Sequence, residues 1–260
     1  MRIDLNADVG ESYGAWQMGQ DEALIPLVTS VNIACGAHAG DPLVMERTVA
    51  LAHASGVQIG AHPGYPDRDG FGRRDMSLTP DELEAWLLFQ LGALSAFVRD
   101  AGAELHHVKP HGALYNRAAQ DADVAEAVAR AVCRFDRSLV LIGLCGSRLL
   151  DAGRAQGLPV AAEAFADRAY EADGSLRSRR HPDAVLADPE AAAEQAVSIV
   201  VLGKVTARDG TTVTLHADTL CIHGDTPGAA DYARLVRTEL AAAGATVEPL
   251  PAPGRRSRTR

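Results

Sequence analysis

Lysine is scarce in this chain of 260 residues, which has 25 Lys plus Arg against 34 Asp plus Glu. Only Lys109 and Lys204 are lysines, and four of the arginines stand in the last six residues. The net charge of −9 therefore understates the acidity of the rest of the chain, and no basic stripe crosses it. Because phosphate backbones repel such a surface, the composition argues against a nucleic-acid-binding protein.

Paired cysteines and long apolar runs are also missing. The four cysteines are widely spaced, with no CxxC pair, as expected of reduced thiols. No run of 18 apolar residues occurs, and Asp4 and Asp8 interrupt the apolar pattern of the first ten residues. We therefore expect neither a signal peptide nor a membrane span, and predict a cytoplasmic protein.

Several signatures of enzyme sites are absent from the sequence. There is no GxxxxGK[ST], no GxGxxG after a predicted strand, no GxSxG elbow and no HExxH pair. The chain therefore offers no recognisable nucleotide-binding loop, serine triad or helical zinc motif of its own.

Short apolar runs alternate with longer helical patterns, which predicts a parallel sheet built from strand–helix units. Capping signals mark helix starts at Asp41–Pro42, at Thr79–Pro80 with Glu82, and at Thr226–Pro227. The runs predicted to be strands are 3–8, 30–35, 57–61, 105–109, 139–144, 159–163 and 219–223.

Two further segments stand apart from this alternation. An Asp-Gly turn between 203–206 and 211–216 predicts a hairpin inserted before the last strand. The last ten residues are rich in Pro, Gly, Ser and Arg. We expect one domain over residues 1–250 and a disordered basic tail over 251–260.

Polar residues gather at the ends of six predicted strands. In a (β/α) barrel such groups converge on one mouth, whereas an open sheet uses only those near a switch point, so the pattern favours a closed α/β barrel. The residues concerned are Asp4, Asn6, Asp8, Asn32, His38, His62, Lys109, His111, Glu163, Asp167, Arg168, His223 and Asp225.

Asp4, Asn6 and Asp8 share one face of the first strand because side chains alternate with a period of two. Buried carboxylates need hydrogen-bond donors, a metal or a shared proton. A hydrogen-bonded network that supports the neighbouring loops is the alternative to a functional role. Asp8, His38 and His62 would together form the Asp plus two His set that a zinc or similar divalent metal site uses. Each histidine could instead be a satisfied core residue.

Cationic residues provide candidate anion sites. Arg73 and Arg74 lie in a loop over 64–74 and could clamp a substrate carboxylate or phosphate, although a solvated loop fits equally well. Lys109 ends an apolar strand and could act as a point charge or as a base. Asp225 could orient His223 as a general base.

Six sequence blocks resemble the LamB/YcsF family and occur in that family's order. The blocks are DLNADVGESYG (4–14), VNIACGAHAGDP (31–42), GAHPGYPDRDGFGRR (60–74), VKPHGALYN (108–116), EAFADRAY (163–170) and CIHGDTP (221–227). The resemblance implies a seven-stranded (β/α) barrel of the glycoside hydrolase/deacetylase type. It also implies part of an ATP-dependent 5-oxoprolinase that acts with 5-oxoprolinase subunits B and C. That enzyme opens the lactam of 5-oxo-L-proline to L-glutamate and hydrolyses ATP to ADP and phosphate.

The implied chemistry assigns roles to residues in these blocks. Lys109 and Arg168 would hold substrate oxygens, Asp8 or His223 would activate water, and His111 would protonate the leaving nitrogen, with ATP as co-substrate. Asp167 is a further catalytic candidate. The expected substrate-binding residues are Asn6, Asn32, Arg73, Arg74, Glu163 and Asp225.

Two other functions stay open at this point. One is a metal-dependent, ATP-independent amide hydrolase or deacetylase that uses Asp8, His38 and His62. The other is a non-catalytic, substrate-binding protein, against which the many ionisable groups at strand ends argue.

Overall fold

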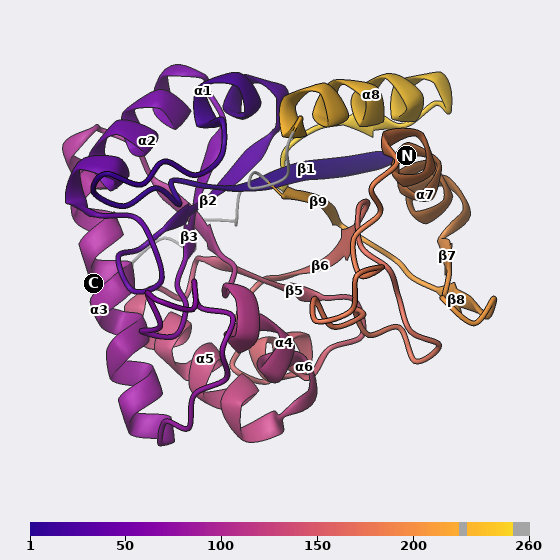
Figure 1. The fold of residues 1–260 in the computed structure, drawn as a ribbon. Coiled ribbons are helices and arrows are strands. Elements are labelled where there is room, and N and C mark those ends of the chain that lie inside the picture. Colours follow the sequence, from indigo (N-terminus) through magenta and orange to yellow (C-terminus); the bar gives the residue numbers. More distant parts are fainter. Residues whose placement is uncertain (224–227, 252–260) are drawn as a thin grey trace.

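The computed structural model describes residues 1–223 and 228–251. Seven parallel strands form a ring in the order β1-β2-β3-β4-β5-β6-β9, which closes because β9 also pairs with β1 (Figure 1). The predicted seven-stranded (β/α) barrel is confirmed, and each predicted strand overlaps an observed one. The strands are β1 (Arg2–Val9), β2 (Ser30–Ala34), β3 (Gln58–His62), β4 (Leu105–Val108), β5 (Val140–Leu144), β6 (Val160–Phe165) and β9 (Thr219–His223).

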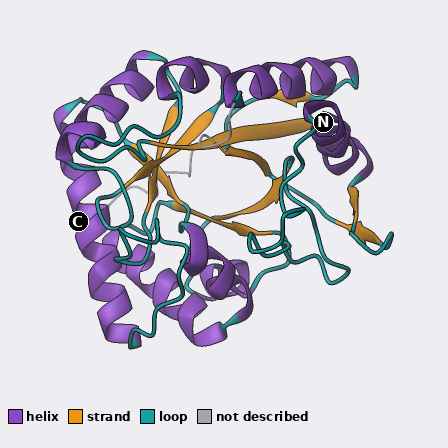
Figure 2. Cartoon of the chain, in the orientation of Figure 1, coloured by secondary structure: helices purple, strands orange, loops and turns teal. Residues whose placement is uncertain are grey.

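Helices cover the outside of this ring (Figure 2). The side chain of Asp41 caps α2, and Thr79 with Glu82 forms a capping box on α3, as predicted. The predicted start at Thr226–Pro227 lies outside the described residues. The helices are α1 (Asp21–Leu24), η1 (Ile25–Leu27), α2 (Pro42–Ala54), α3 (Pro80–Asp100), α4 (Gly112–Gln120), α5 (Ala122–Phe135), α6 (Arg148–Ala155), α7 (Pro189–Leu202) and α8 (Ala229–Ala242).

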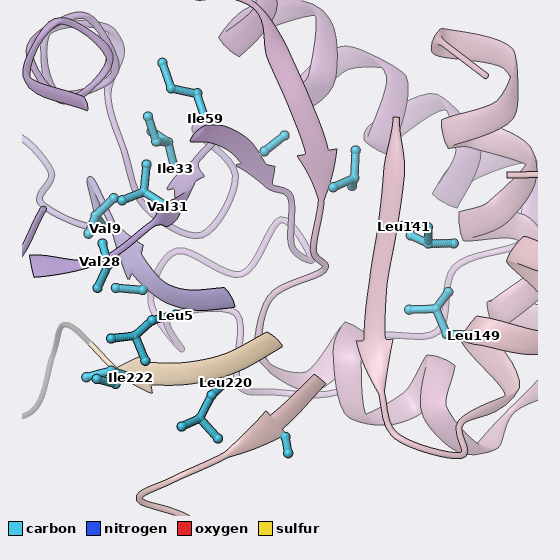
Figure 3. Packing of buried hydrophobic residues seen from close by; sticks show 14 of the residues in the cluster. Leu5, Val9, Val28, Val31, Ile33, Ile59, Leu141, Leu149, Leu220 and Ile222 are labelled. Carbon is cyan, nitrogen blue, oxygen red and sulfur yellow. The ribbon is translucent and has the colours of Figure 1, made fainter. Parts of the chain in front are cut away.

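The main hydrophobic core lies between the strands and the helices. Leu5 and Val9 of β1 belong to the same buried cluster as Ile33 of β2 and Ile222 of β9 (Figure 3). Each buried side chain of this size contributes about 1.5–3 kcal/mol. Because alternate residues point to opposite faces of a strand, this packing leaves Asp4, Asn6 and Asp8 for the interior of the barrel.

The interior of the barrel is apolar beside β5 and the first residues of β6. Val140, Ile142 and Ala161 form a buried cluster with Leu250. Leu250 follows β10 (Thr246–Val247), which pairs with the first residues of β1, and its carbonyl accepts a hydrogen bond from Gln58. The segment after α8 therefore closes the end of the barrel at which the strands begin.

The predicted hairpin is also confirmed. β7 (Lys204–Thr206) and β8 (Thr212–Thr214) pair in antiparallel fashion between α7 and β9. Gly210 supplies a φ of +88° in the turn, a conformation that glycine adopts without strain. In the described part of the chain, no helix is long and apolar enough to cross a membrane.

Candidate active site

A cavity of about 1120 Å³ lies at the carboxyl ends of the strands. Asp8, His62 and Lys109 line it on the polar side, and Leu144 and Phe165 line it on the apolar side. Loop 173–180, which follows β6, forms part of its rim. The arginines that line it are Arg73, Arg117, Arg168, Arg177, Arg179 and Arg180. Ionisable groups from several strand ends and a cationic rim thus face the same space.

Lys109 lies at the centre of the polar side and is 2% exposed. Its Nζ lies 2.8 Å from Glu163 Oε1 and 3.0 Å from Asp8 Oδ1. It also donates to Cys221 Sγ at 3.0 Å. Burial acts to lower the pKa of Lys109, but the charges of Asp8, Cys221 and Glu163 outweigh it and raise the pKa well above its usual value. Lys109 is therefore an ammonium ion that bridges two carboxylates.

Asparagine side chains hold this ion group in place. Asn32 Nδ2 donates to Asp8 Oδ1 at 2.9 Å and to Asn6 Oδ1 at 2.8 Å. His107 Nε2 in turn donates to Asn32 Oδ1 at 2.9 Å. The His107 ring fits only because residue 60 is glycine, since a Cβ on Gly60 would lie 2.0 Å from His107 Nε2. Asn32 supports Asp8, and Asn6 accepts from Lys109 and donates to Glu163. These two predicted substrate-binding residues are not among those that line the cavity.

Two histidines face each other beside this group. His62 Nδ1 lies 2.7 Å from the carbonyl oxygen of Lys109, and His111 Nε2 lies 2.8 Å from that of Phe71. Because a carbonyl oxygen only accepts, each of these nitrogens carries the hydrogen. The other two nitrogens, His62 Nε2 and His111 Nδ1, are 3.0 Å apart.

Glu11 and His38 complete the imidazole cluster. Glu11 Oε1 lies 3.3 Å from His111 Nδ1 and 3.5 Å from His38 Nε2. The His38 ring stacks on the His111 ring, with centroids 3.8 Å apart. Burial, followed by the neighbouring histidines, lowers the pKa of both His38 and His111 well below the usual range. Both rings are therefore neutral at pH 7.

The predicted metal-ligand set is only partly brought together. Among the described residues, one group of potential ligands has its donor atoms within 4.8 Å of one another, and it consists of Glu11, His62 and His111. It shares only His62 with the predicted set. Asp8 Oδ2 does lie 3.4 Å from His62 Nε2, while Asp8 Oδ1 is engaged by Lys109 and Asn32. His38 does not line the cavity.

The predicted arginines separate into two environments. Arg168 is 4% exposed, lines the cavity and donates to the carbonyls of Ala184 and Arg177. Burial, followed by the nearby charge of Arg179, lowers its pKa to about 10, so it stays cationic at pH 7. Arg73 also lines the cavity. Arg74 does not, because it pairs with Asp67 elsewhere in the loop.

Asp167, His223 and Asp225 complete the predicted catalytic and substrate-binding residues. Asp167 is buried but does not line the cavity; after burial itself, its charge raises the pKa of Tyr232 on α8. The register of β9 pairs His223 with Asp8 along the backbone. Asp225 lies in a segment that the structure does not describe.

Sequence reasoning missed three residues that shape this site. Glu11 follows Asp8 in the first sequence block, and this proximity could have marked it as a candidate site residue. Tyr115 of α4 is 4% exposed and lines the cavity. Burial, followed by the Glu163 carboxylate, raises the pKa of its hydroxyl well above the usual value, so the hydroxyl keeps its proton. His107 gave no signal, because a histidine inside a strand is commonly a core residue.

Comparison with known proteins agrees with the six sequence blocks. Residues 3–254 match the model of the LamB/YcsF family. The chain belongs to this family. It is 62% identical over 247 residues to the A subunit of 5-oxoprolinase from Chloroflexus aggregans, covering 95% of this chain and 98% of the relative. It is 58% identical over 248 residues to the protein of the same name from Methylococcus capsulatus, covering 95% of each chain.

A solved structure extends the likeness to three dimensions. The lactam utilization protein from Thermus thermophilus superposes with a TM-score of 0.90 at 50% identity, covering 96% of this chain and 100% of that chain. The region that matches the LamB/YcsF family therefore includes the strands of the barrel, the ion group around Lys109 and the imidazole cluster with Glu11.

Proposed function

We propose that this LamB/YcsF protein is the A subunit of an ATP-dependent 5-oxoprolinase and that its barrel mouth is where the lactam ring is opened. Relatives named as the A subunit of 5-oxoprolinase match at 54–62% identity over 95% of the chain. The site feature that best supports this function is the Asp8–Lys109–Glu163 group at a cavity rimmed by arginines. Such a site suits a small anionic substrate whose charge changes during reaction.

The chemistry explains why ATP is needed. A lactam is an unstrained amide with a poor leaving group, so direct attack by water is slow. Transfer of the γ-phosphoryl group of ATP to the amide oxygen releases ADP and makes the ring carbon more electrophilic. Water then adds to that carbon and the C–N bond breaks with protonation of the nitrogen, which gives an acyl phosphate. A second water hydrolyses this to L-glutamate and phosphate.

The proposed roles follow from the contacts. Asp8 accepts the proton of the attacking water, because Lys109 and Asn32 fix its Oδ1 and the carboxylate lines the cavity. Arg168 and Arg73 hold carboxylate or phosphoryl oxygens.

The proton donor differs from the predicted one. The N–H of His111 is already bound to the carbonyl of Phe71 and the ring is neutral. The Tyr115 hydroxyl, which keeps its proton and lines the cavity, is therefore the better placed donor to the leaving nitrogen.

We further propose that 5-oxoprolinase subunits B and C are the partners and that ATP is a co-substrate of the complex. The chain would act in the cytoplasm as one barrel domain over residues 1–250, followed by a basic tail over 251–260. None of the roles given above to Asp8, Tyr115 and the arginines requires a divalent metal.

Glutamate release from 5-oxo-L-proline tests this function. We expect release only when the chain, its cognate B and C subunits and ATP are all present, with phosphate formed in equal amount. Hydrolysis by the chain alone without ATP would instead support the metal-dependent amide hydrolase. Full activity of an Asp8→Asn variant in the complete complex would support the non-catalytic, substrate-binding role.

A further inference from the structure

We propose that Glu11, His62 and His111 bind one divalent transition-metal ion, such as Zn²⁺, at the wall of the cavity. His62 Nε2 and His111 Nδ1 are 3.0 Å apart, and Glu11 Oε1 lies 3.3 Å from His111 Nδ1. Ligand atoms about 2.0–2.2 Å from a tetrahedral zinc stand about 3.3–3.6 Å from each other. These two separations are close to that value, and all three donor atoms lie within 4.8 Å of one another, so small side-chain shifts would let one ion bind between them.

The hydrogen positions on the two rings strengthen this inference. The carbonyls of Lys109 and Phe71 take the N–H groups of His62 and His111. The nitrogens not engaged by a carbonyl, His62 Nε2 and His111 Nδ1, therefore face each other at 3.0 Å beside the Glu11 carboxylate. A divalent ion between them would take one lone pair from each ring. Metal-binding histidines are commonly oriented in this way, through a carbonyl that accepts the outer N–H.

The loop behind the rings is shaped to hold them. Phe71, whose carbonyl orients His111, has a φ of +53° and is the one non-glycine residue with positive φ in the described chain. Such a conformation costs about 1–3 kcal/mol and persists where the surroundings fix it. The next residue, Gly72, has a φ of +63°, and a Cβ there would lie 2.7 Å from His111 Cδ2. The backbone thus closes directly onto the imidazole.

The three proposed ligands line the cavity, whereas the neighbouring His38 does not. Glu11, His62 and His111 all line the cavity. His38 lies behind His111, is 1% exposed, and neither of its ring nitrogens has a hydrogen-bond partner among the described residues. Three protein ligands with a fourth position facing the cavity is the arrangement of catalytic rather than structural zinc sites. In this arrangement His38 packs against a ligand, and Asp8, whose Oδ2 lies 3.4 Å from His62 Nε2, is held beside the metal site by Lys109 and Asn32.

Metal binding needs only this chain, so it can be tested apart from 5-oxoprolinase activity. The isolated full-length protein is stripped with a chelator and titrated with Zn²⁺ by calorimetry, with metal content measured after dialysis. We expect one ion per chain. Loss of a supporting partner typically costs 10–100-fold in affinity, so Glu11→Gln, His62→Gln and His111→Gln are each expected to lose more than about 100-fold.

Matched controls come from the same cluster and from the surface. His38→Gln and Asp8→Asn change buried neighbours of the ligands and should each cost no more than the 10–100-fold typical of a supporting partner, less than any ligand variant. His53→Gln, on the exposed face of α2, should leave it unchanged. Circular dichroism confirms that each variant is folded. If a ligand variant fails to fold, the visible spectrum of the Co²⁺-loaded wild type takes its place, and intense bands of a four- or five-coordinate ion are expected.

Three results would overturn the assignment. The first is no stoichiometric Zn²⁺ binding by the wild-type chain, which would leave a shared proton between His62 and His111. The second is a loss of affinity in His38→Gln or Asp8→Asn as large as in His111→Gln, which would return the site to Asp8, His38 and His62. The third is the weak spectrum of a six-coordinate aqueous Co²⁺ ion.

Discussion

Asp4 and Asp8 lie on the same face of β1, and both are nearly inaccessible, at 2% and 8% exposure. Among the described residues, the side chain of Asp4 receives only hydroxyl donors, from Thr29, Ser30 and Thr219. Asp8 receives the Lys109 ammonium and lines the cavity. The same side chain therefore has two different roles along one strand, and what decides between them is the charge of its partners and its access to the cavity rather than its depth.

The largest expected effect separates the two aspartates by activity. Asp8→Asn removes the proposed proton acceptor, and we expect kcat of the complete complex to fall by about 10²–10⁴-fold. Asp4→Asn serves as the control, because it lies at the far end of the strand from the cavity, and kcat should not change measurably. An equal fall in kcat in both variants would remove the distinction between them.

The next effect separates them by stability. Asp4→Asn places an amide N–H₂ against hydroxyls that now donate, so we expect a loss of about 1–3 kcal/mol in the free energy of unfolding. Urea denaturation measures this. A variant as stable as the wild type would show that the three hydroxyls do not anchor Asp4.

The stability difference between the wild type and Asp4→Asn should also depend on pH. Burial raises the pKa of Asp4 in the folded state above its unfolded value of 3.8. Its stabilising contribution is therefore complete below pH 3.8 and is lost as pH rises through the higher folded value. The stability difference between wild type and Asp4→Asn should be greatest in acid and should narrow as pH rises. A difference that widens with pH would contradict this assignment.

The smallest expected effect comes from changing Thr219, which connects Asp4 with Asn6. Thr219 donates to Asp4 and accepts from Asn6 Nδ2 at 2.7 Å. Thr219→Val keeps the shape but removes both bonds, while Thr29 and Ser30 still serve Asp4. We expect a loss of about 1 kcal/mol in stability, measured by urea denaturation, and a smaller fall in kcat than for Asp8→Asn. A fall in kcat as large as that of Asp8→Asn would show that the two groups act as one.

The barrel could be predicted from the sequence because its signals are local. Short apolar runs, capping boxes and an Asp-Gly turn each depend on residues close in the chain, and they located the seven barrel strands and the β7–β8 hairpin. The polar residues at many strand ends also predict that the sheet closes into a barrel, because parallel strands bring such residues to one mouth.

The details of the site could not be predicted in the same way. His38 and His62 follow successive strands in equivalent positions, so spacing alone made them equal candidates. Only the packed structure shows that His38 stacks behind His111 while Glu11 reaches the cavity. Likewise, the sequence predicts Lys109 as a point charge or a base but not its partners, whereas the folded barrel places it between two carboxylates. Such contacts depend on which side chains meet across strands, which a single sequence does not specify.

The closure between β1 and β9 has a consequence for how the chain folds. Asp4 and Thr219 are 215 residues apart in the sequence, yet they share a hydrogen bond. During synthesis β1 can pair with β2 early, but its other edge and its polar face must wait until β9 has been made. Such distant pairing slows folding and leaves an open strand edge exposed to other chains. The barrel strand that is made first is thus among the last to be completed.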